Sequence, residues 1–343
     1  MLKQYKPTLD KLTKIVGKSY VLIDEQDTRH YRQGIRFGEG KVLAVVCPGT
    51  LLEQWQALQT IIEADCVVIM QAANTGLTGG STPYGDEYDR PVIIMSTRRL
   101  QGIQVILDGK QVVCLPGATL DNLERTLKPY NREPHSVIGS SCIGASVLGG
   151  VCNNSGGALV RRGPAYTEMA LYARVNESGE LELINHLGID LGNTAEEILT
   201  RLQKQDYETG QITTQTTQLA SDNRYAHDVK QVDADSPARF NADPTRLYEA
   251  SGSAGKVCVF AVRLDTFEKV ESRVFYIGSN DHDDLTAIRR YLLTSLPSLP
   301  IAGEYIHRDA FSIGAKYGKD TFLFIERFGT VNIPCLLYTS PSP

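Results

Sequence analysis

Residues 136–157, SVIGSSCIGASVLGGVCNNSGG, decide which fold the sequence predicts. They include six glycines, five serines and two adjacent asparagines, an unusual density for this chain. Glycine permits positive φ and lets the backbone approach a ligand closely. The N–H and C=O groups of such a segment are strong hydrogen-bonding groups. The stretch therefore predicts a backbone cradle along a planar, polar ligand.

A second glycine-rich stretch, MQAANTGLTGGSTP, lies upstream at residues 70–83 and follows an apolar run. Successive backbone N–H groups at the end of a strand form a concavity that binds phosphate or another anion. The hydroxyls of Thr75, Thr78 and Ser81 add possible donors. A surface loop is the alternative interpretation, because glycine runs are common in loops. Two separate cradles together suggest a dinucleotide held in an extended pose.

Two standard phosphate-binding motifs are excluded by spacing. The Rossmann fingerprint needs G-x-G-x-x-G at the start of a helix. Here G-x-x-G-G is followed by Ser-Thr-Pro, which resists helix formation. The P-loop needs a glycine five positions before Gly-Lys-Ser, and Leu12 occupies that position ahead of Gly17. Neither test supports a nicotinamide or ATP site.

Strands and helices alternate in the first half of the chain. The run KVLAVVCPG (41–49) predicts a strand, and apolar residues at helical spacing after Thr50, a good N-cap, predict a helix. With the apolar run before residues 70–83 they form a β-α-β unit. We also expect two hairpins, one turning at Asp108-Gly109 and one around Glu177-Ser178-Gly179.

A polar segment divides the second half of the chain. Residues 203–241 are rich in Gln, Thr and Asp and lack periodicity, so we expect a long surface excursion. Residues 256–267, KVCVFAVRLDTF, predict a buried strand. A new strand–helix pattern begins after Phe267, with SRVFYIGSN as the strand and DDLTAIRRYLLTSL as the helix. These changes place a domain boundary near Asp265.

Composition excludes several classes of protein. The 343 residues are 42% hydrophobic and 22% charged, as in an ordinary globular protein, and the net charge of −5 argues against nucleic acid as the general partner. The seven cysteines are scattered and lack metal-ligand spacing, so we interpret them as reduced, mostly buried thiols. No signal peptide and no long apolar run is present, which predicts a cytoplasmic chain with at most peripheral membrane contact.

Longer motifs carry a resemblance to a known family. They are AANTGLTGGSTP, GDEYDRPVIIMST, REPHSVIGSSCIGASVLGGVCNNSGG, RRGPAYTEM, NHLGIDLG and ARFNADPTRLYEASGSAGKVCVFAVRLDTFE. The chain resembles the flavoproteins of the vanillyl-alcohol oxidase (PCMH) type, and among them the bacterial quinone-dependent D-lactate dehydrogenases. The resemblance implies FAD, oxidation of D-lactate to pyruvate, and transfer of electrons to a membrane quinone. It also implies peripheral attachment to the cytoplasmic side of the inner membrane, on an anionic lipid surface.

The resemblance also implies the α+β class and a domain order. A two-lobed FAD-binding domain is expected over residues 1–265, with its PCMH-type core at about 38–210. The start of an α+β cap domain follows at 266–310, and the start of a membrane-binding region at 311–343. Family chains are much longer, and the tail CLLYTSPSP after Pro334 abandons the preceding pattern. We therefore expect a C-terminal truncation or a join to foreign sequence there; a natural disordered terminus is the alternative.

Expected FAD contacts follow from the resemblance, residue by residue. They are Ala72, Ala73, Asn74, Thr75, Gly76, Gly80, Ser81, Gly139, Ser146, Gly156 and Val259. Val259 is a plausible contact because a strand can bind through its backbone. The first stretch contains neither histidine nor cysteine, so we expect FAD to be bound non-covalently. Cys142 and Cys152, beside the second cradle, are interpreted as small packing residues.

Oxidation of a 2-hydroxy acid needs a base for the hydroxyl proton and a cation for the carboxylate. His135 is our candidate base, although a structural histidine bonded to backbone is an equal alternative. Arg132 and Arg162 are candidate carboxylate partners, because the guanidinium fork binds both oxygens; exposure to solvent is the alternative for each. His307 and Arg308 are further candidates near the expected cap. Two rival functions remain: an FAD-binding module without turnover, and an enzyme of the same fold acting on another 2-hydroxy acid.

Overall fold

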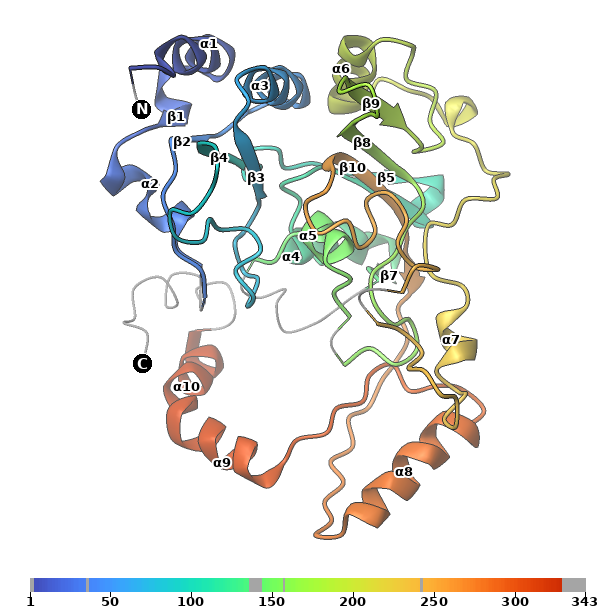
Figure 1. The fold of residues 1–343 in the computed structure, drawn as a ribbon. Coiled ribbons are helices and arrows are strands. Elements are labelled where there is room, and N and C mark those ends of the chain that lie inside the picture. The colour runs from blue at the N-terminus through green and yellow to red at the C-terminus, as the bar shows by residue number, and fades with distance from the viewer. Residues whose placement is uncertain (1–2, 35–36, 136–143, 157, 241–242, 329–343) are drawn as a thin grey trace.

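The computed structural model describes residues 3–34, 37–135, 144–156, 158–240 and 243–328 (Figure 1). Its first lobe is a four-stranded sheet in the order β1-β2-β4-β3. β2, β4 and β3 are parallel, and β1 is antiparallel to β2. The elements of this lobe are α1 (Lys6–Val16), β1 (Val21–Leu22), α2 (Glu25–Arg32), β2 (Ala44–Val46), α3 (Leu51–Glu63), β3 (Val67–Gln71) and β4 (Val92–Ser96).

The predicted β-α-β unit is confirmed as β2-α3-β3. Thr50 caps α3 as expected, because its hydroxyl oxygen accepts a hydrogen bond from the backbone N–H of Glu53 at 3.1 Å. Leu51, Trp55 and Leu58 recur at helical spacing and are buried. A capped helix with one apolar face thus connects the two parallel strands that lie on either side of β4.

The second lobe is a five-stranded antiparallel sheet in the order β5-β6-β10-β8-β9. Both predicted hairpins are present, β5-β6 turning through Asp108 and Gly109 with positive φ, and β8-β9 with Gly179 at φ 81°. The predicted buried strand is β10, the centre of the sheet. The strands are β5 (Ile103–Ile106), β6 (Gln111–Cys114), β8 (Ala170–Val175), β9 (Leu181–Asn185) and β10 (Cys258–Asp265).

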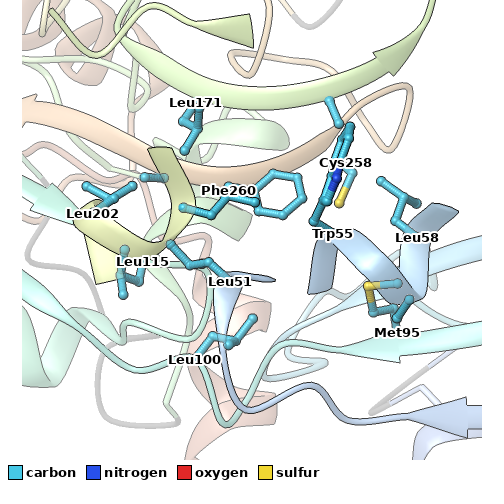
Figure 2. Close-up of a cluster of buried hydrophobic side chains, with 14 of the residues drawn as sticks. Leu51, Trp55, Leu58, Met95, Leu100, Leu115, Leu171, Leu202, Cys258 and Phe260 are labelled. Atoms are coloured by element: carbon cyan, nitrogen blue, oxygen red, sulfur yellow. The ribbon is translucent and has the colours of Figure 1, made fainter. Parts of the chain in front are cut away.

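One hydrophobic core joins the two lobes. Trp55 of α3 and Phe260 of β10 pack with ring centroids 6.2 Å apart, and Met95 of β4 belongs to the same buried cluster (Figure 2). Helix α6 (Ala195–Lys204) adds Leu202 to this core. The opposite face of the five-stranded sheet is covered by α4 (Leu120–Leu127) and α5 (Val147–Cys152). Because α3 contacts both sheets, the lobes are parts of one packed body.

The polar segment after α6 follows the surface, as predicted. Beyond the short helices η5 (Thr209–Gln211) and α7 (Tyr225–Asp228), residues 205–240 are irregular and mostly exposed. Asp222 is a charged exception, because its side chain is 3% exposed and pairs with two arginines; Ile212 and Ala220 are also buried. The excursion is thus anchored to the body by buried charge.

After β10 the described part of the chain continues into a short strand and three helices. β11 (Phe267–Glu268) pairs with β7 (Arg132–Glu133), and α8 (His282–Thr294), α9 (Arg308–Tyr317) and α10 (Lys319–Phe328) lie below the two sheets in Figure 1. The predicted helix is confirmed as α8. The strand predicted at SRVFYIGSN is wrong: residues 272–279 form no strand, and Tyr276 is 95% exposed, because no neighbouring backbone in the described residues pairs with it.

None of the helices in the described ranges is long and apolar enough to cross a bilayer. The five cysteines within these ranges are free thiols, as predicted, and four of them are buried. Cys142, Cys335 and the tail after Pro334 lie outside the described residues.

Candidate functional site

The first glycine-rich stretch is a loop fixed by side-chain hydrogen bonds at the end of β3. The buried amide of Gln71 donates to the carbonyl oxygens of Tyr31 at 2.9 Å and Ser81 at 2.6 Å. Asn74, at φ 54°, donates to the carbonyl oxygen of Gln33 at 2.8 Å and accepts from the Ser81 hydroxyl at 2.8 Å. The Ser81 hydroxyl therefore shapes the loop rather than pointing freely at a ligand.

The glycines of this loop leave open space. A Cβ added at Gly76 or Gly80 would meet no atom within 4 Å. Ala72, Ala73 and Thr75 are partly exposed beside them and contribute little side-chain bulk. The loop thus offers exposed backbone that a phosphate group can approach closely.

The second stretch is described over residues 144–156, so the expected contact Gly139 lies outside the described residues. Ser146 caps α5, accepting a hydrogen bond from the Gly149 N–H at 3.1 Å. Gly144 has φ 82° and open space where a Cβ would stand. At Gly156 a Cβ would come within 2.9 Å of the Pro164 Cα, so packing alone requires glycine there. The stretch therefore combines an open turn with a tightly packed end.

The two stretches converge at the first residues of β10. Cys258 Sγ lies 3.7 Å from Met70 Sδ of the first stretch. The backbone N–H of Ala254, just before β10, donates to the carbonyl oxygen of Cys152 in the second stretch at 3.0 Å. Val259, the expected backbone contact, follows Cys258 at this junction and is buried. The structure thus brings the start of the first stretch and the α5 segment of the second close to β10, although they lie far apart in sequence.

Gln54 of α3 reaches the same junction. Its Nε2 donates to Cys258 Sγ at 3.2 Å and to the Val259 carbonyl oxygen at 3.3 Å. Its Oε1 is buried and has no hydrogen-bond partner among the described residues. An unpartnered buried acceptor at this junction fits a ligand that carries hydroxyl or N–H donors, as a dinucleotide does. Sequence reasoning did not single out Gln54, because its helical spacing marks it only as a core position.

The three candidate catalytic residues lie together in one cleft. Arg132, His135 and Arg162 line a cleft of about 420 Å³ beside the second stretch. Arg161, Asp222 and Phe267 are among its other lining residues. These last three were not predicted: Asp222 comes from the polar excursion, which has no periodicity to mark a buried position.

His135 is buried, and its hydrogen bonds define its tautomer. Its Nε2 lies 3.4 Å from the carbonyl oxygen of Arg162, which can only accept, so Nε2 carries the proton. Nδ1 then has the lone pair, and it has no partner among the described residues. Burial lowers the pKa of His135 to about 4, so the ring is neutral at pH 7. Both expectations for this histidine, a backbone bond and an available base, are compatible with this geometry.

The two predicted arginines differ in their surroundings. Arg162 is paired with Glu133 at 2.6 Å and lies over the Phe267 ring, with Cζ 4.0 Å from the ring centre. Arg132 donates to the Thr266 hydroxyl at 2.5 Å and to its carbonyl oxygen at 2.6 Å. No carboxylate within the described ranges pairs with Arg132, so its charge is available to an anion in the cleft.

Arg161 also brings charge to the cleft, and its Nε and Nη2 donate to the Leu299 carbonyl oxygen at 3.1 and 2.9 Å. His307 and Arg308 do not line the cleft. His307 instead caps α9, its Nδ1 accepting from the Asp309 N–H at 3.1 Å, and Arg308 is exposed. The structure thus favours the Arg132–His135 region over the α9 terminus.

Comparison with known proteins gives two family matches. Residues 42–182 match the FAD binding domain, and residues 274–340 match the membrane-binding domain of D-lactate dehydrogenase. The chain is 61% identical to a quinone-dependent D-lactate dehydrogenase of Haemophilus influenzae and 56% identical to that of Escherichia coli, each over 96% of this chain. The enzyme of Corynebacterium glutamicum is 49% identical over 93% of it.

Nearly the whole chain is thus similar to quinone-dependent D-lactate dehydrogenases. Relative to these dehydrogenases it spans 56–58% of their length. Its FAD-binding domain has the PCMH-type fold that the sequence predicts. An alkyldihydroxyacetonephosphate synthase structure shares this fold with a TM-score of 0.50 and 12% identity, over 77% of this chain and 41% of that one. In this chain, the described elements from β2 to β9 carry the FAD-binding match.

Proposed function

We propose that this chain holds the FAD-binding half of an enzyme that oxidises D-lactate to pyruvate and passes the electrons to a membrane quinone. The similarity of nearly the whole chain to enzymes of that name carries the proposal. The residues present suit FAD, because Gly76, Gly80 and Gly144 leave open space beside the backbone, and Gln54, bonded to Cys258 and Val259 of β10, has an unpartnered buried Oε1. Val259 and the glycines of both stretches would hold the cofactor.

We further propose that FAD is bound non-covalently. The first stretch lacks the histidine or cysteine that a covalent bond requires. Burial raises the pKa of Cys152, beside the second stretch, to about 11, so its thiol is protonated and a poor nucleophile. The contacts expected at Ala72, Ala73, Asn74, Thr75, Gly76, Gly80, Ser81, Gly139, Ser146 and Gly156 are part of the same proposal.

The residues of the cleft would bind the substrate and accept its hydroxyl proton. FAD, when bound, supplies the acceptor for the hydride from the α-carbon. Arg132 binds the carboxylate of lactate, since its charge has no carboxylate partner in the described part of the chain. His135 accepts the hydroxyl proton at Nδ1, which carries the free lone pair. Arg162, already paired with Glu133, orients His135 through its carbonyl oxygen.

An absorption spectrum tests this assignment. The purified chain reconstituted with FAD should show a bound-flavin spectrum that bleaches on anaerobic addition of D-lactate and not of L-lactate. Glycolate and 2-hydroxyglutarate are tested as alternative substrates. If either bleaches the flavin in preference to D-lactate, that acid is the substrate instead. A bound flavin that none of the acids bleaches would favour an FAD-binding module without turnover. Absence of bound flavin would overturn the proposal.

The proposed membrane partner is an anionic lipid surface on the cytoplasmic side. Residues 274–340 match a membrane-binding domain, and α9 and α10 within them expose large apolar side chains. These side chains are Phe311, Ile313, Tyr317, Phe322, Leu323 and Phe328. Lys316 and Lys319 stand among them. Exposed aromatics beside lysines suit a peripheral contact with acidic headgroups.

Replacing both Lys316 and Lys319 with glutamine should weaken binding to vesicles that contain phosphatidylglycerol. A basic residue near an anionic surface contributes about 1 kcal/mol, so the loss should be about thirtyfold. Co-sedimentation measures the partition coefficient, with neutral phosphatidylcholine vesicles for comparison. The paired substitution K14Q/K18Q, in the first lobe, is the matched control and should leave binding unchanged. Equal loss in both variants would contradict the assignment.

A further inference from the structure

Asp222, in the polar excursion, is a buried carboxylate that the proposed reaction does not use. Its Oδ2 accepts a hydrogen bond from Arg239 Nη1 at 3.0 Å and forms an ion pair with Arg246, whose Nε lies 2.9 Å away. Its Oδ1 accepts the backbone N–H groups of Arg224 and Tyr225 at 2.9 and 3.1 Å. The side chains of Asp222, Arg239 and Arg246 are all less than a tenth exposed. Burying charge is costly, so three buried charged groups in an otherwise exposed segment call for a reason.

Arg239 extends this cluster to the second glycine-rich stretch. Its Nη1 binds Asp222, and its Nη2 donates to Asn154 Oδ1 at 2.9 Å. A guanidinium is planar and rigid, so the direction of one bond fixes the direction of the other. Arg246 binds the same carboxylate oxygen, but its other ion pair goes to Asp228 at 3.4 Å. Only one of the two arginines therefore connects the carboxylate to Asn154.

Asn154 stands where the backbone of the second stretch changes direction. It follows α5 with φ 51°, in the left-handed region, and its backbone N–H donates to the Val151 carbonyl oxygen. Its amide packs on Gly252, where a Cβ would come within 2.7 Å of Nδ2. It lies between Ser146 and Gly156, both expected FAD contacts. A hydrogen bond that fixes the Asn154 side chain therefore also fixes the backbone conformation of the segment that would face the cofactor.

We propose that Asp222 and Arg239 are positioning residues for the cofactor-binding backbone. The carboxylate orients the Arg239 guanidinium, the guanidinium fixes Asn154, and residues 144–156 are thereby held in their binding shape. This inference rests on the FAD binding proposed above. It gives the polar excursion a role in cofactor affinity, although no residue of the excursion was expected to contact FAD.

The sharpest test is Arg239→Lys. Lysine keeps the positive charge beside Asp222 but cannot form both bonds in a fixed plane. We expect the variant to bind FAD about tenfold more weakly, the effect of one lost hydrogen bond to a charged group. Arg246→Lys is the matched control, because it changes the other arginine on the same carboxylate, and its FAD affinity should stay within about twofold of wild type. Flavin fluorescence titration of the apoprotein measures both affinities. Equal weakening in the two variants would overturn the proposal.

A second variant removes the other partner of the hydrogen bond between Arg239 and Asn154. Asn154→Gly keeps the left-handed backbone conformation and removes the amide. It should weaken FAD binding as much as Arg239→Lys, and the double variant should be no weaker than either single one, since both remove the same bond. Additive losses would show that the two residues act separately and would contradict the inference. This cycle also keeps the proposal testable if one of the single variants folds poorly.

Hydrogen exchange separates this inference from the proposed function. In FAD-free protein, the amide protons of residues 147–156 should exchange about tenfold faster in Arg239→Lys than in Arg246→Lys. Unchanged exchange would overturn the positioning role even if FAD binds. If the wild-type chain binds no FAD, the proposed function fails, and the exchange comparison still decides whether Arg239 holds this stretch.

Discussion

Replacing Gly80 with leucine is expected to weaken FAD binding by about 100-fold, or about 2.7 kcal/mol, while leaving the unfolding free energy of FAD-free protein unchanged. Gly80 is exposed, its φ is not in the left-handed region, and an added Cβ would meet no protein atom within 4 Å. The protein therefore has no need of glycine for its own packing. The reason for glycine would be the close approach of the cofactor to the loop backbone, which a leucine side chain would block.

Gly210→Leu is the matched control. Gly210 is also exposed with open space at its Cβ position, and it lies in the polar excursion, far in sequence from both cradles. Its substitution should change neither FAD affinity nor stability. Flavin fluorescence titration and denaturant unfolding of both variants provide the comparison. A Gly80→Leu chain that binds FAD as tightly as the wild type would show that the first loop is not a phosphate cradle.

Replacing Arg263 with methionine should lower the unfolding free energy by about 3–5 kcal/mol. Arg263 is 1% exposed at the centre of the five-stranded sheet. It donates to Gln111 Oε1 at 2.7 Å and to the carbonyl oxygens of Leu187 and Thr213 at 2.9 and 3.0 Å. Methionine fills most of the volume but leaves these buried acceptors without donors, and each unsatisfied group costs free energy.

Arg174→Met provides the control on the neighbouring strand. Arg174 is about half exposed and pairs with Glu182 at 2.5 Å across β8 and β9. An exposed pair contributes at most about 1 kcal/mol, so this variant should stay close to the wild type in urea unfolding. If Arg263→Met lost no more stability than Arg174→Met, the carbonyl contacts of Arg263 would not be stabilising the fold.

Local features of the fold were predictable because each depends on neighbours in sequence. The helix after Thr50 follows from a cap and a 3.6-residue period, and the β5-β6 hairpin follows from Asp108-Gly109 between two apolar runs. The strand expected at residues 272–280 shows the limit of this reasoning. Its apolar pattern suits a strand, but pairing needs a partner backbone, and sequence pattern does not reveal whether one is present.

Some residues of the candidate site could be predicted from the sequence, but the contacts between them could not. Glycine density marked both cradles, and the motif around His135 marked the residues beside the second one. The contribution of Asp222 could not be seen, because a buried carboxylate in a polar segment looks like any exposed one until its arginine partners are placed. Arg263 is similar: a lone arginine within an apolar strand gives no sign that carbonyl groups from three other segments surround it.

The shared core has a kinetic consequence. Trp55 of α3 packs on Phe260 of β10 in the cluster that also holds Met95 of β4, so the two sheets cannot swing apart as rigid halves. A cofactor bound on the exposed backbone of the two glycine-rich stretches would therefore enter and leave without a hinge motion between the lobes. The lobes would keep one relative orientation with and without the cofactor, so the rate of its release should depend on its contacts with the two stretches and not on a domain opening.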